Sequence, residues 1–496
     1  MRGLALRSPS LKNKPLALLW LRDDLRLADH PALAAALQKG YAVLPLYIDE
    51  PPSPESRAMG AASKVWLHHA LSALQESLQE RGSTLLIKRG DALKILNQQI
   101  EQTGATALYW SRRYGAQERA TDMQIKNFAK EQGLDVESFN AHLLVEPWHV
   151  TTKTGQPMKV FTPFWRAARA LGEPSPPLPA PKKIPLPDLD FEALKSLSIT
   201  QLRLLPTKPD WASPMLAHWT ISEKGAQKRL GHFLENGLKG YAEDRNRPDL
   251  DHVSRLSPYL RFGMISPRQV WHAAVAACAD GRSNASDKDL STFQSELGWR
   301  EFSYHLLYHN PNLAHKNYQS RFDAFPWQDN ERLVKAWQKG LTGYPIVDAG
   351  MRELWQTGFM HNRVRMIAAS FLIKHLMTDW RIGENWFWDT LFDADPASNP
   401  ASWQWVAGSG ADAAPYFRIF NPILQGERFD PKGAYIRRYI PELAALPDDL
   451  IHKPWTAPQG LLAQFKIKLG QDYPLPLIDH GEGRDRALAA FKSLNE

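Results

Sequence analysis

The sequence predicts two domains of different class: an α/β domain built on a parallel five-stranded sheet, followed by a larger all-α domain. Three observations support this prediction. The 496 residues are too many for one ordinary core. Short apolar runs alternate with amphipathic stretches in the first part of the chain, and from about residue 219 the hydrophobic periodicity is helical. We therefore place the α/β domain at residues 15–148 and the all-α domain at 219–496.

Five apolar runs supply the strands of the predicted sheet. Amphipathic stretches at 30–40 and 64–82 separate the first three runs, and this alternation predicts parallel pairing. No GxGxxG or GxxxxGKS/T loop follows any run, so a ligand of this domain would lie at the carboxyl ends of the strands without a glycine-rich phosphate cradle. The five runs are LALLWL (16–21), AVLPLYID (42–49), TLLIKRG (84–90), ALYWSRRY (107–114) and LDVESFN (134–140).

Two further segments are predicted to be irregular. Residues 172–190, GEPSPPLPAPKKIPLPDLD, are too rich in proline for a helix or a central strand, so we assign a proline-rich linker to 149–218. The basic segment 1–14 contains no acid and precedes only a short apolar run, which favours a frayed tail over a targeting peptide. In the second domain, residues 220–241 and 363–380 have the periodicity of amphipathic helices.

Composition limits the classes of function. The single cysteine, Cys278, excludes an internal disulfide and a cysteine-ligated iron–sulfur cluster, and it favours a reducing, cytoplasmic setting. No apolar run reaches the roughly eighteen residues of a membrane-spanning helix. The net charge of +7 suggests a polyanionic partner. The 18 tryptophans crowd into the C-terminal half, where a large helical core is the ordinary explanation.

The stretch DADPASNPASWQW, Asp393 to Trp405, combines two acids, an amide and two indoles. It begins like a calcium loop, but Pro396 occupies position four, position six is no glycine and position twelve is no glutamate, so we expect no metal. Asp393 and Asp395 could instead accept hydrogen bonds from N–H donors or ribose hydroxyls. Asn399 can both donate and accept. Such groups can hold a polar ring system in place without giving the ring a charge.

The segment GFMHNRVRM has two interpretations. If it opens a helix, Asn362 and Met366 lie on one face four residues apart, with Phe359 beside them, while Arg363 and Arg365 point elsewhere. That face would carry an amide and a thioether. A helix cap with surface arginines is the alternative.

Two more motifs have a specific and an ordinary interpretation. SRLSPYL, residues 254–260, places two hydroxyls and an arginine beside a proline that can start a helix, which would suit a diphosphate. Most such serines are only caps. SELGWREF places Glu296 and Arg300 four residues apart with Trp299 between them, and a surface ion pair is the ordinary explanation.

Six segments are long and specific enough to indicate a relationship: WLRDDLRLADHPAL, SRLSPYLRFGMISPRQVW, ELGWREF, GLTGYPIVDAGMREL, MHNRVRM and DADPASNPASWQWVAGSGADAAPYFRIFNP. Together they strongly resemble the DNA photolyase and cryptochrome family, over nearly the whole chain. The resemblance implies a Rossmann-like, photolyase-type α/β domain that binds an antenna pigment, and a larger helical domain that binds FAD.

By this resemblance, Asn399 faces N5 of the flavin, and the protein supplies orientation and electrostatics for the cofactor's electron transfer. Phe293 and Phe359 stand where relatives often have tryptophan, and Val253 replaces a frequent threonine, which should change packing against the flavin. The FAD-binding positions carried over are Tyr241, Val253, Ser254, Arg255, Leu256, Ser257, Phe293, Arg300, Arg365, Asp393, Ala394, Asp395 and Asn399.

The resemblance also divides the tryptophans by role. Trp403, Trp380 and Trp327 match the electron-transfer chain that leads from the flavin to the surface. Trp405 and Trp299 match the pair that stacks on a flipped-out pyrimidine dimer. Stacking of an aromatic ring on a base contributes about 1–3 kcal/mol per base.

The implied activity is light-dependent repair of cyclobutane pyrimidine dimers in DNA, by electron transfer from photoexcited reduced FAD to the flipped-out dimer. Relatives that repair the (6-4) photoproduct carry histidines at the positions of Asn362 and Met366, and neither residue here can donate a proton. The pattern is most like the class I dimer photolyases, which are deoxyribodipyrimidine photo-lyases, with class III kept open. The implied catalytic residues are Glu296, Asn362, Met366 and Asn399, and the implied DNA or lesion contacts are Arg245, Glu296, Trp299, Asn362, Arg363, Trp405 and Arg418.

A cryptochrome-type blue-light photoreceptor, which signals rather than repairs, is the alternative function. Its common marks are a long, low-complexity C-terminal extension and a substitution at the N5 asparagine. The present sequence has neither of these marks and keeps Asn399, so we expect repair.

A second chromophore is implied as well. YWSRRYGAQERATD resembles the antenna-binding segment, with Gln117 and Glu118 where folate-using relatives often have Asn-Glu, whereas Ala314 and His315 depart from two folate-contacting positions. We expect 5,10-methenyltetrahydrofolate, with 8-hydroxy-5-deazaflavin or FMN as alternatives. The expected partner is UV-damaged DNA, with no membrane and no metal, and the expected enzyme is a cytoplasmic monomer.

Overall fold

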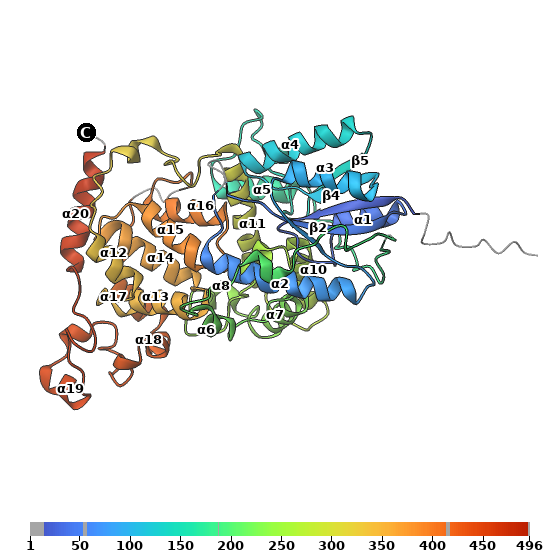
Figure 1. The fold of residues 1–496 in the computed structure, drawn as a ribbon. Helices are drawn as coiled ribbons and strands as arrows, with labels where there is room; N and C mark the ends of the chain where they lie inside the picture. The colour runs from blue at the N-terminus through green and yellow to red at the C-terminus, as the bar shows by residue number, and fades with distance from the viewer. Residues whose placement is uncertain (1–13, 53–56, 187, 413–416, 495–496) are drawn as a thin grey trace, which may run out of the picture.

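The computed structural model describes residues 14–52, 57–186, 188–412 and 417–494. Figure 1 shows an α/β domain beside a larger helical domain, as the sequence predicts. The predicted tail at 1–14 lies outside the described residues except for Lys14.

The α/β domain contains one parallel sheet of five strands: β1 (Leu16–Leu21), β2 (Ala42–Asp49), β3 (Leu86–Arg89), β4 (Ala107–Ser111) and β5 (Asp135–Phe139). All five predicted strands are confirmed. Their spatial order is β3-β2-β1-β4-β5, with β1 in the middle because its six residues are apolar and are buried on both faces of the sheet. The order reverses between β1 and β4, and at such a point the carboxyl ends of the strands open a crevice.

Four helices pack around this sheet in Figure 1: α1 (Pro31–Gln38), α2 (Ala61–Gln79), α3 (Ala92–Thr103) and α4 (Ala116–Glu131). Local signals define their ends. The His30 side chain caps α1 by accepting from the Leu33 amide, and Asp91 caps α3 by accepting from the Lys94 amide. Helix α3 ends at Gly104, whose φ of +66° favours glycine.

The two domains share one continuous apolar core. Odd-numbered residues of β1 belong to a core that extends into the helical domain and includes Phe293 and Phe392. Even-numbered residues belong to a second core, which also takes in Leu194 from the segment after the α/β domain. Trp66 of α2 lies at the junction, with ring centroids 5.3 Å from Trp219 and 5.0 Å from Tyr259. The helical domain therefore packs directly against the α/β domain.

Helix α5 (Phe161–Ala170) and the short helix α6 (Ala212–Leu216) both lie inside the range taken as linker. Residues 172–186 form no helix or strand, as their prolines predict. The ten residues Phe161–Ala170 form helix α5, which packs on the helical domain. The domain boundaries 149–218 and 219–496 stay predictions. The segment 149–218 does not only join the two domains, because its helix α5 packs on the helical domain.

The helical domain consists of α6 (Ala212–Leu216), α7 (Glu223–Asn236), α8 (Tyr241–Asp244), α9 (Ser257–Arg261), α10 (Pro267–Ala279), α11 (Asp287–His309), α12 (Glu331–Gln338), α13 (Pro345–Thr357), α14 (Asn362–Ser370), α15 (Trp380–Thr390), α16 (Ser398–Ala407), α17 (Pro422–Phe429), α18 (Ala434–Tyr439), α19 (Gln459–Gln464) and α20 (His480–Ser493). The predicted helix at 363–380 is interrupted: α14 continues into a π-helical turn, Phe371–His375, and α15 begins only at Trp380. Periodicity alone does not distinguish a π-turn from an α-helix.

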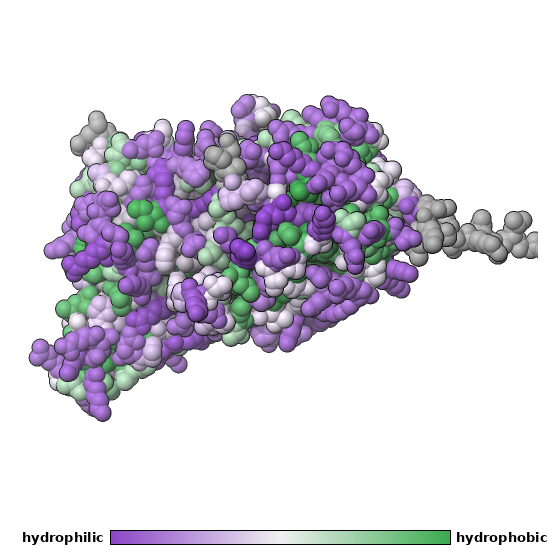
Figure 2. All heavy atoms as spheres, viewed as in Figure 1, coloured by the Kyte–Doolittle hydropathy of each residue, from purple (hydrophilic) through white to green (hydrophobic). Residues whose placement is uncertain are grey.

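The face of the molecule in Figure 2 is mostly hydrophilic, with hydrophobic residues in small separate groups. Within the residues that the structure describes, no helix is both long and apolar enough to cross a membrane.

Candidate active site

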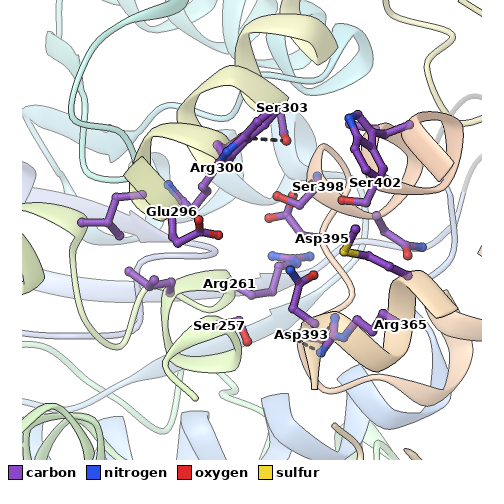
Figure 3. A pocket seen from close by; sticks show the side chains of 18 of the residues that line it. Ser257, Arg261, Glu296, Arg300, Ser303, Arg365, Asp393, Asp395, Ser398 and Ser402 are labelled. Carbon is purple, nitrogen blue, oxygen red and sulfur yellow. Dashed lines mark hydrogen bonds and ion pairs between the residues drawn. The ribbon is translucent and has the colours of Figure 1, made fainter. Parts of the chain in front are cut away.

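A cavity of about 500 Å³ opens in the helical domain (Figure 3). Most of the predicted site residues line it, although they come from segments far apart in the chain. From the predicted cofactor set these are Tyr241, Val253, Ser254, Arg255, Leu256, Ser257, Phe293, Arg300, Arg365, Asp393, Asp395 and Asn399. From the predicted catalytic, DNA-contact and electron-transfer sets they are Arg245, Glu296, Trp299, Asn362, Met366, Trp403 and Trp405. The predicted positions that do not line it are Ala394, Arg363, Arg418, Trp380, Trp327, Gln117 and Glu118.

Asp393 forms a two-pronged ion pair with Arg365 at the cavity wall. The two guanidinium nitrogens of Arg365 lie 3.1 and 2.8 Å from the two carboxylate oxygens of Asp393. The Nε of Arg365 donates to the Met360 carbonyl, which fixes the arm of the arginine. Helical spacing sets Arg365 off the face of Asn362 and Met366, but its long side chain still reaches the cavity wall, where it meets Asp393.

Asp395 anchors the first turn of α16. Its carboxylate accepts from the amides of Ala397 and Ser398, at 2.9 and 2.7 Å, and from the Tyr304 hydroxyl at 2.8 Å. Burial and the neighbouring carboxylate raise the pKa of Tyr304 well above its usual value, so the hydroxyl stays a donor. Asp395 thus sets the direction of the helix that carries Asn399.

The amide of Asn399 has a defined orientation. Its Nδ2 donates to the backbone carbonyl of Glu384 at 3.1 Å and to the Glu384 carboxylate at 2.8 Å. Both partners are acceptors, so the nitrogen must face α15, and the amide oxygen is left for a donor in the cavity. Arg57 of the α/β domain pairs with the same carboxylate through two contacts of 2.7 Å. Sequence reasoning missed Glu384 and Arg57, because nothing local links them to Asn399.

Glu296 of α11 pairs with Arg245, and each side chain is 30% exposed. Burial raises the pKa of Glu296, and the Arg245 guanidinium offsets part of this shift. The ion pair between Glu296 and Arg300 that spacing suggested as the ordinary explanation is not formed. Arg300 donates to the His142 carbonyl at 2.6 Å and lies 3.5 Å from Glu301.

The helix face predicted for Asn362 and Met366 is confirmed. Helix α14 begins at Asn362, and both side chains line the cavity, with Phe359 beside them. His361 caps this helix by accepting from the Arg363 amide at its Nδ1. Burial, together with neighbouring arginines, lowers the pKa of His361 to about 3.

Arginines form a cluster next to the cavity. Arg363 donates to Asn246 at 2.6 Å and stacks over Phe429. Burial lowers the pKa of Arg363 to about 10, and the charges of Arg245, Arg418 and Arg428 act in the same direction. Arg428, which is exposed, was missed by sequence reasoning.

The three tryptophans of the predicted electron-transfer chain occupy one core region. Trp403 and Trp380 are buried within it, and Trp327 packs against it. The ring of Trp403 lies 5.0 Å from Phe387 and 6.2 Å from Trp337, between centroids. Their role in electron transfer stays a prediction.

The predicted antenna positions lie elsewhere. Gln117 and Glu118 are in the first turn of α4, next to the carboxyl end of β4. Gln117 is exposed, whereas Glu118 folds back over Gly115. Their role also stays a prediction.

The donors in the cavity fit an anionic cofactor with a polar ring system. Arg255 Nε and Arg300 Nη2 are buried and have no hydrogen-bond partner within the described part of the chain. Such atoms call for an acceptor, and a diphosphate next to Ser254 and Ser257 would supply one. The volume is typical of sites that hold a cofactor. Among the residues described, no group of three or more His, Cys, Asp or Glu side chains is placed to hold a metal.

Comparison with known proteins agrees with this geometry. Residues 17–182 match a family model described as DNA photolyase, and residues 293–493 match one described as the FAD binding domain of DNA photolyase. A deoxyribodipyrimidine photo-lyase from Agrobacterium fabrum is 51% identical over 98% of this chain and 99% of its own length. Cryptochrome-1 from Arabidopsis thaliana is 36% identical over 96% of this chain and 70% of its own. The crystal structure of a bacterial class III photolyase from Agrobacterium tumefaciens superimposes with a TM-score of 0.93 at 50% identity, covering 99% of this chain and 100% of that one.

Proposed function

The chain belongs to the DNA photolyase and cryptochrome family, and from that premise we propose that it is a flavoenzyme that repairs cyclobutane pyrimidine dimers in DNA in a light-dependent reaction. The observation that carries this proposal is the joint lining of one cavity by the indoles of Trp299 and Trp405, the carboxyl of Glu296 and the amide of Asn399. Indole faces suit stacking on extruded bases, and the polar groups suit a flavin and a base edge.

The inner polar residues are proposed to hold FAD. Ser254, Arg255, Ser257 and Arg300 would bind the diphosphate, and Asp393, Arg365, Asp395 and Asn399 would hold and orient the rest of the cofactor. When bound, FAD would supply the photoexcited electron that opens the dimer. Asn399, with its nitrogen held by Glu384, would offer its oxygen to a flavin N–H.

Two observations support a cyclobutane dimer over a (6-4) photoproduct. Asn362 and Met366 line the cavity and cannot donate a proton. His361, which precedes Asn362, is neutral because its pKa is lowered to about 3, and its Nδ1 is already an acceptor for the Arg363 amide. The proposed chemistry therefore needs no acid at this face, and Glu296 would bind the base by hydrogen bonds.

DNA binding is proposed for partly or fully exposed residues at the cavity and in the arginine cluster beside it. Trp299 and Trp405 would stack on the flipped dimer, and Arg245, Arg363 and Arg418 would contact phosphates. Arg428, in the same arginine cluster, joins the proposed phosphate contacts. Trp403, Trp380 and Trp327 would conduct electrons for photoreduction.

The similarity to a class III structure over the whole chain favours class III over class I. Gln117 and Glu118 are proposed to contact methenyltetrahydrofolate as the antenna. A cytoplasmic, monomeric enzyme remains the expectation from the cysteine content and the family.

The decisive experiment combines purified, flavin-loaded and chemically reduced protein with a duplex that contains one thymine dimer. Under blue light we expect the dimer to be converted to two thymines, as measured by chromatography, with no conversion in the dark. No conversion, with reduced flavin present, would support the photoreceptor alternative, which the similarity to cryptochrome-1 keeps open.

A further inference from the structure

We propose that Phe161 of helix α5 is a positioning residue for Trp299, which it holds in the orientation that receives the lesion. This inference rests on the proposed function of Trp299. It gives a role to a helix that the sequence placed in a linker.

The two rings form the tightest aromatic stack at the cavity. The centroids of Phe161 and Trp299 are 3.7 Å apart, and their planes differ by 8°. Trp299 lines the cavity and Phe161 does not. Phe161 therefore covers one face of the indole, so a base can stack only on the other face.

The backbone of α11 explains how α5 comes so close. Phe161 and Trp165 lie four residues apart, on the same face of α5. The ring of Trp165 presses on Gly298, where an added Cβ would lie 2.7 Å from ring atoms. Because Gly298 precedes Trp299, the contact that only glycine permits also brings Phe161 over the indole.

A second contact fixes the start of α5. The amide of Phe161 donates to the Asp412 carboxylate at 2.9 Å, and Asp412 itself lines the cavity, in the segment after α16. Phe161 is thus held on one side by α11 and on the other by the segment that follows Trp405. A stack held in this way orders the indole before DNA arrives, which reduces the ordering cost of binding.

The substitution Phe161→Leu tests this role. We expect affinity for a dimer-containing duplex to fall about three- to tenfold in the dark, with affinity for undamaged duplex and flavin content unchanged. Phe161→Tyr, which keeps the ring, should restore the affinity. The matched control is Phe164→Leu on the same helix, a buried ring that contacts Phe302 and His305 rather than Trp299. It should lower thermal stability without changing discrimination.

A double-mutant cycle separates positioning from general support of the fold. In a Trp299→Ala background, Phe161→Leu should cause no further loss of dimer affinity. Equal losses in both backgrounds would overturn the proposal.

A measurement without DNA tests the contact between Phe161 and Trp299 separately from the proposed repair function. In protein labelled with 5-fluorotryptophan, the fluorine resonance that disappears in Trp299→Phe should shift or broaden in Phe161→Leu and not in Phe164→Leu. An unchanged resonance would refute the positioning role. If the wild-type protein shows no preference for dimers, the proposed function fails and so does the link to the lesion.

Discussion

The two sides of the cavity are built from similar residue types in different surroundings. At the inner side, Asp393 and Asn399 are each 8% exposed, and their polar groups are matched by Arg365 and Glu384. At the outer side, Arg245 and Glu296 are each 30% exposed, and the indoles of Trp299 and Trp405 are half-buried. A buried charge depends on its partner, whereas an exposed one can turn to water. We therefore expect inner substitutions to act on the fold and the flavin, and outer substitutions to act on DNA.

The largest effect is expected at the inner ion pair. Arg365→Met would leave the buried Asp393 carboxylate without its partner, so the free energy of unfolding should fall by about 3–5 kcal/mol, with loss of FAD. Urea denaturation and flavin absorbance after desalting measure the two effects. Adding Asp393→Leu should recover part of the stability but not the flavin. If Arg365→Met alone kept its stability, the ion pair with Asp393 would not stabilise the fold as its burial indicates.

At the outer side, Trp405→Ala should separate lesion recognition from stability. A stacking residue reads the flipped dimer, so its loss should cost about 1–3 kcal/mol of binding free energy on damaged duplex. The affinity for undamaged duplex and the salt dependence of binding should be unchanged. Equal weakening on undamaged duplex would mean that the indole supports the fold, and the contrast between the two sides would then be wrong.

Lys374 joins α16 to the segment that carries Arg418, and it gives a pH test. It is buried, and its Nζ donates to the carbonyls of Val406 and Arg418, at 2.6 and 2.5 Å. Burial, together with the charge of Arg418, lowers its pKa from 10.5 to about 7. Above that pH the unfolded chain binds a proton that the folded chain does not, so stability rises with pH up to the unfolded pKa.

We expect the difference in unfolding free energy between wild type and Lys374→Met to shift in favour of wild type by about 1 kcal/mol from pH 7 to pH 8. Denaturation of both proteins across this range measures it. A constant difference would place the pKa of Lys374 outside the range.

The smallest effect is expected for a single charge at the outer side of the cavity. Arg245→Ala should weaken binding to damaged and undamaged duplex alike. It should also reduce the slope of log affinity against log salt concentration by about one. Arg332→Ala, an exposed arginine on α12 that does not line the cavity, is the control and should leave the slope unchanged. An unchanged slope for Arg245→Ala would limit its role to its contacts with Glu296 and Tyr241.

Sequence by itself determined the five strands of the sheet and many of the residues that line the cavity. The run LALLWL predicts a strand and the structure confirms it, whereas the place of this strand in the middle of the sheet is a finding of the structure, consistent with burial on both faces. The motif around Asp393 and Asn399 predicts a polar cofactor site because the residue types carry their chemistry with them. These inferences depend on neighbours within a few residues, where backbone geometry limits what the chain can do.

Tertiary structure alone decided the partners. Arg365 turns toward Asp393, Arg57 reaches Glu384 across 327 positions, and Phe161 stacks on Trp299 from a segment taken as linker. None of these contacts has a local signal, because each arises when separately formed helices pack and their side chains satisfy buried charges or fill space beside a glycine. The sequence thus supplies many of the groups that line the cavity, and packing determines which of the predicted groups line it and which way each of them faces.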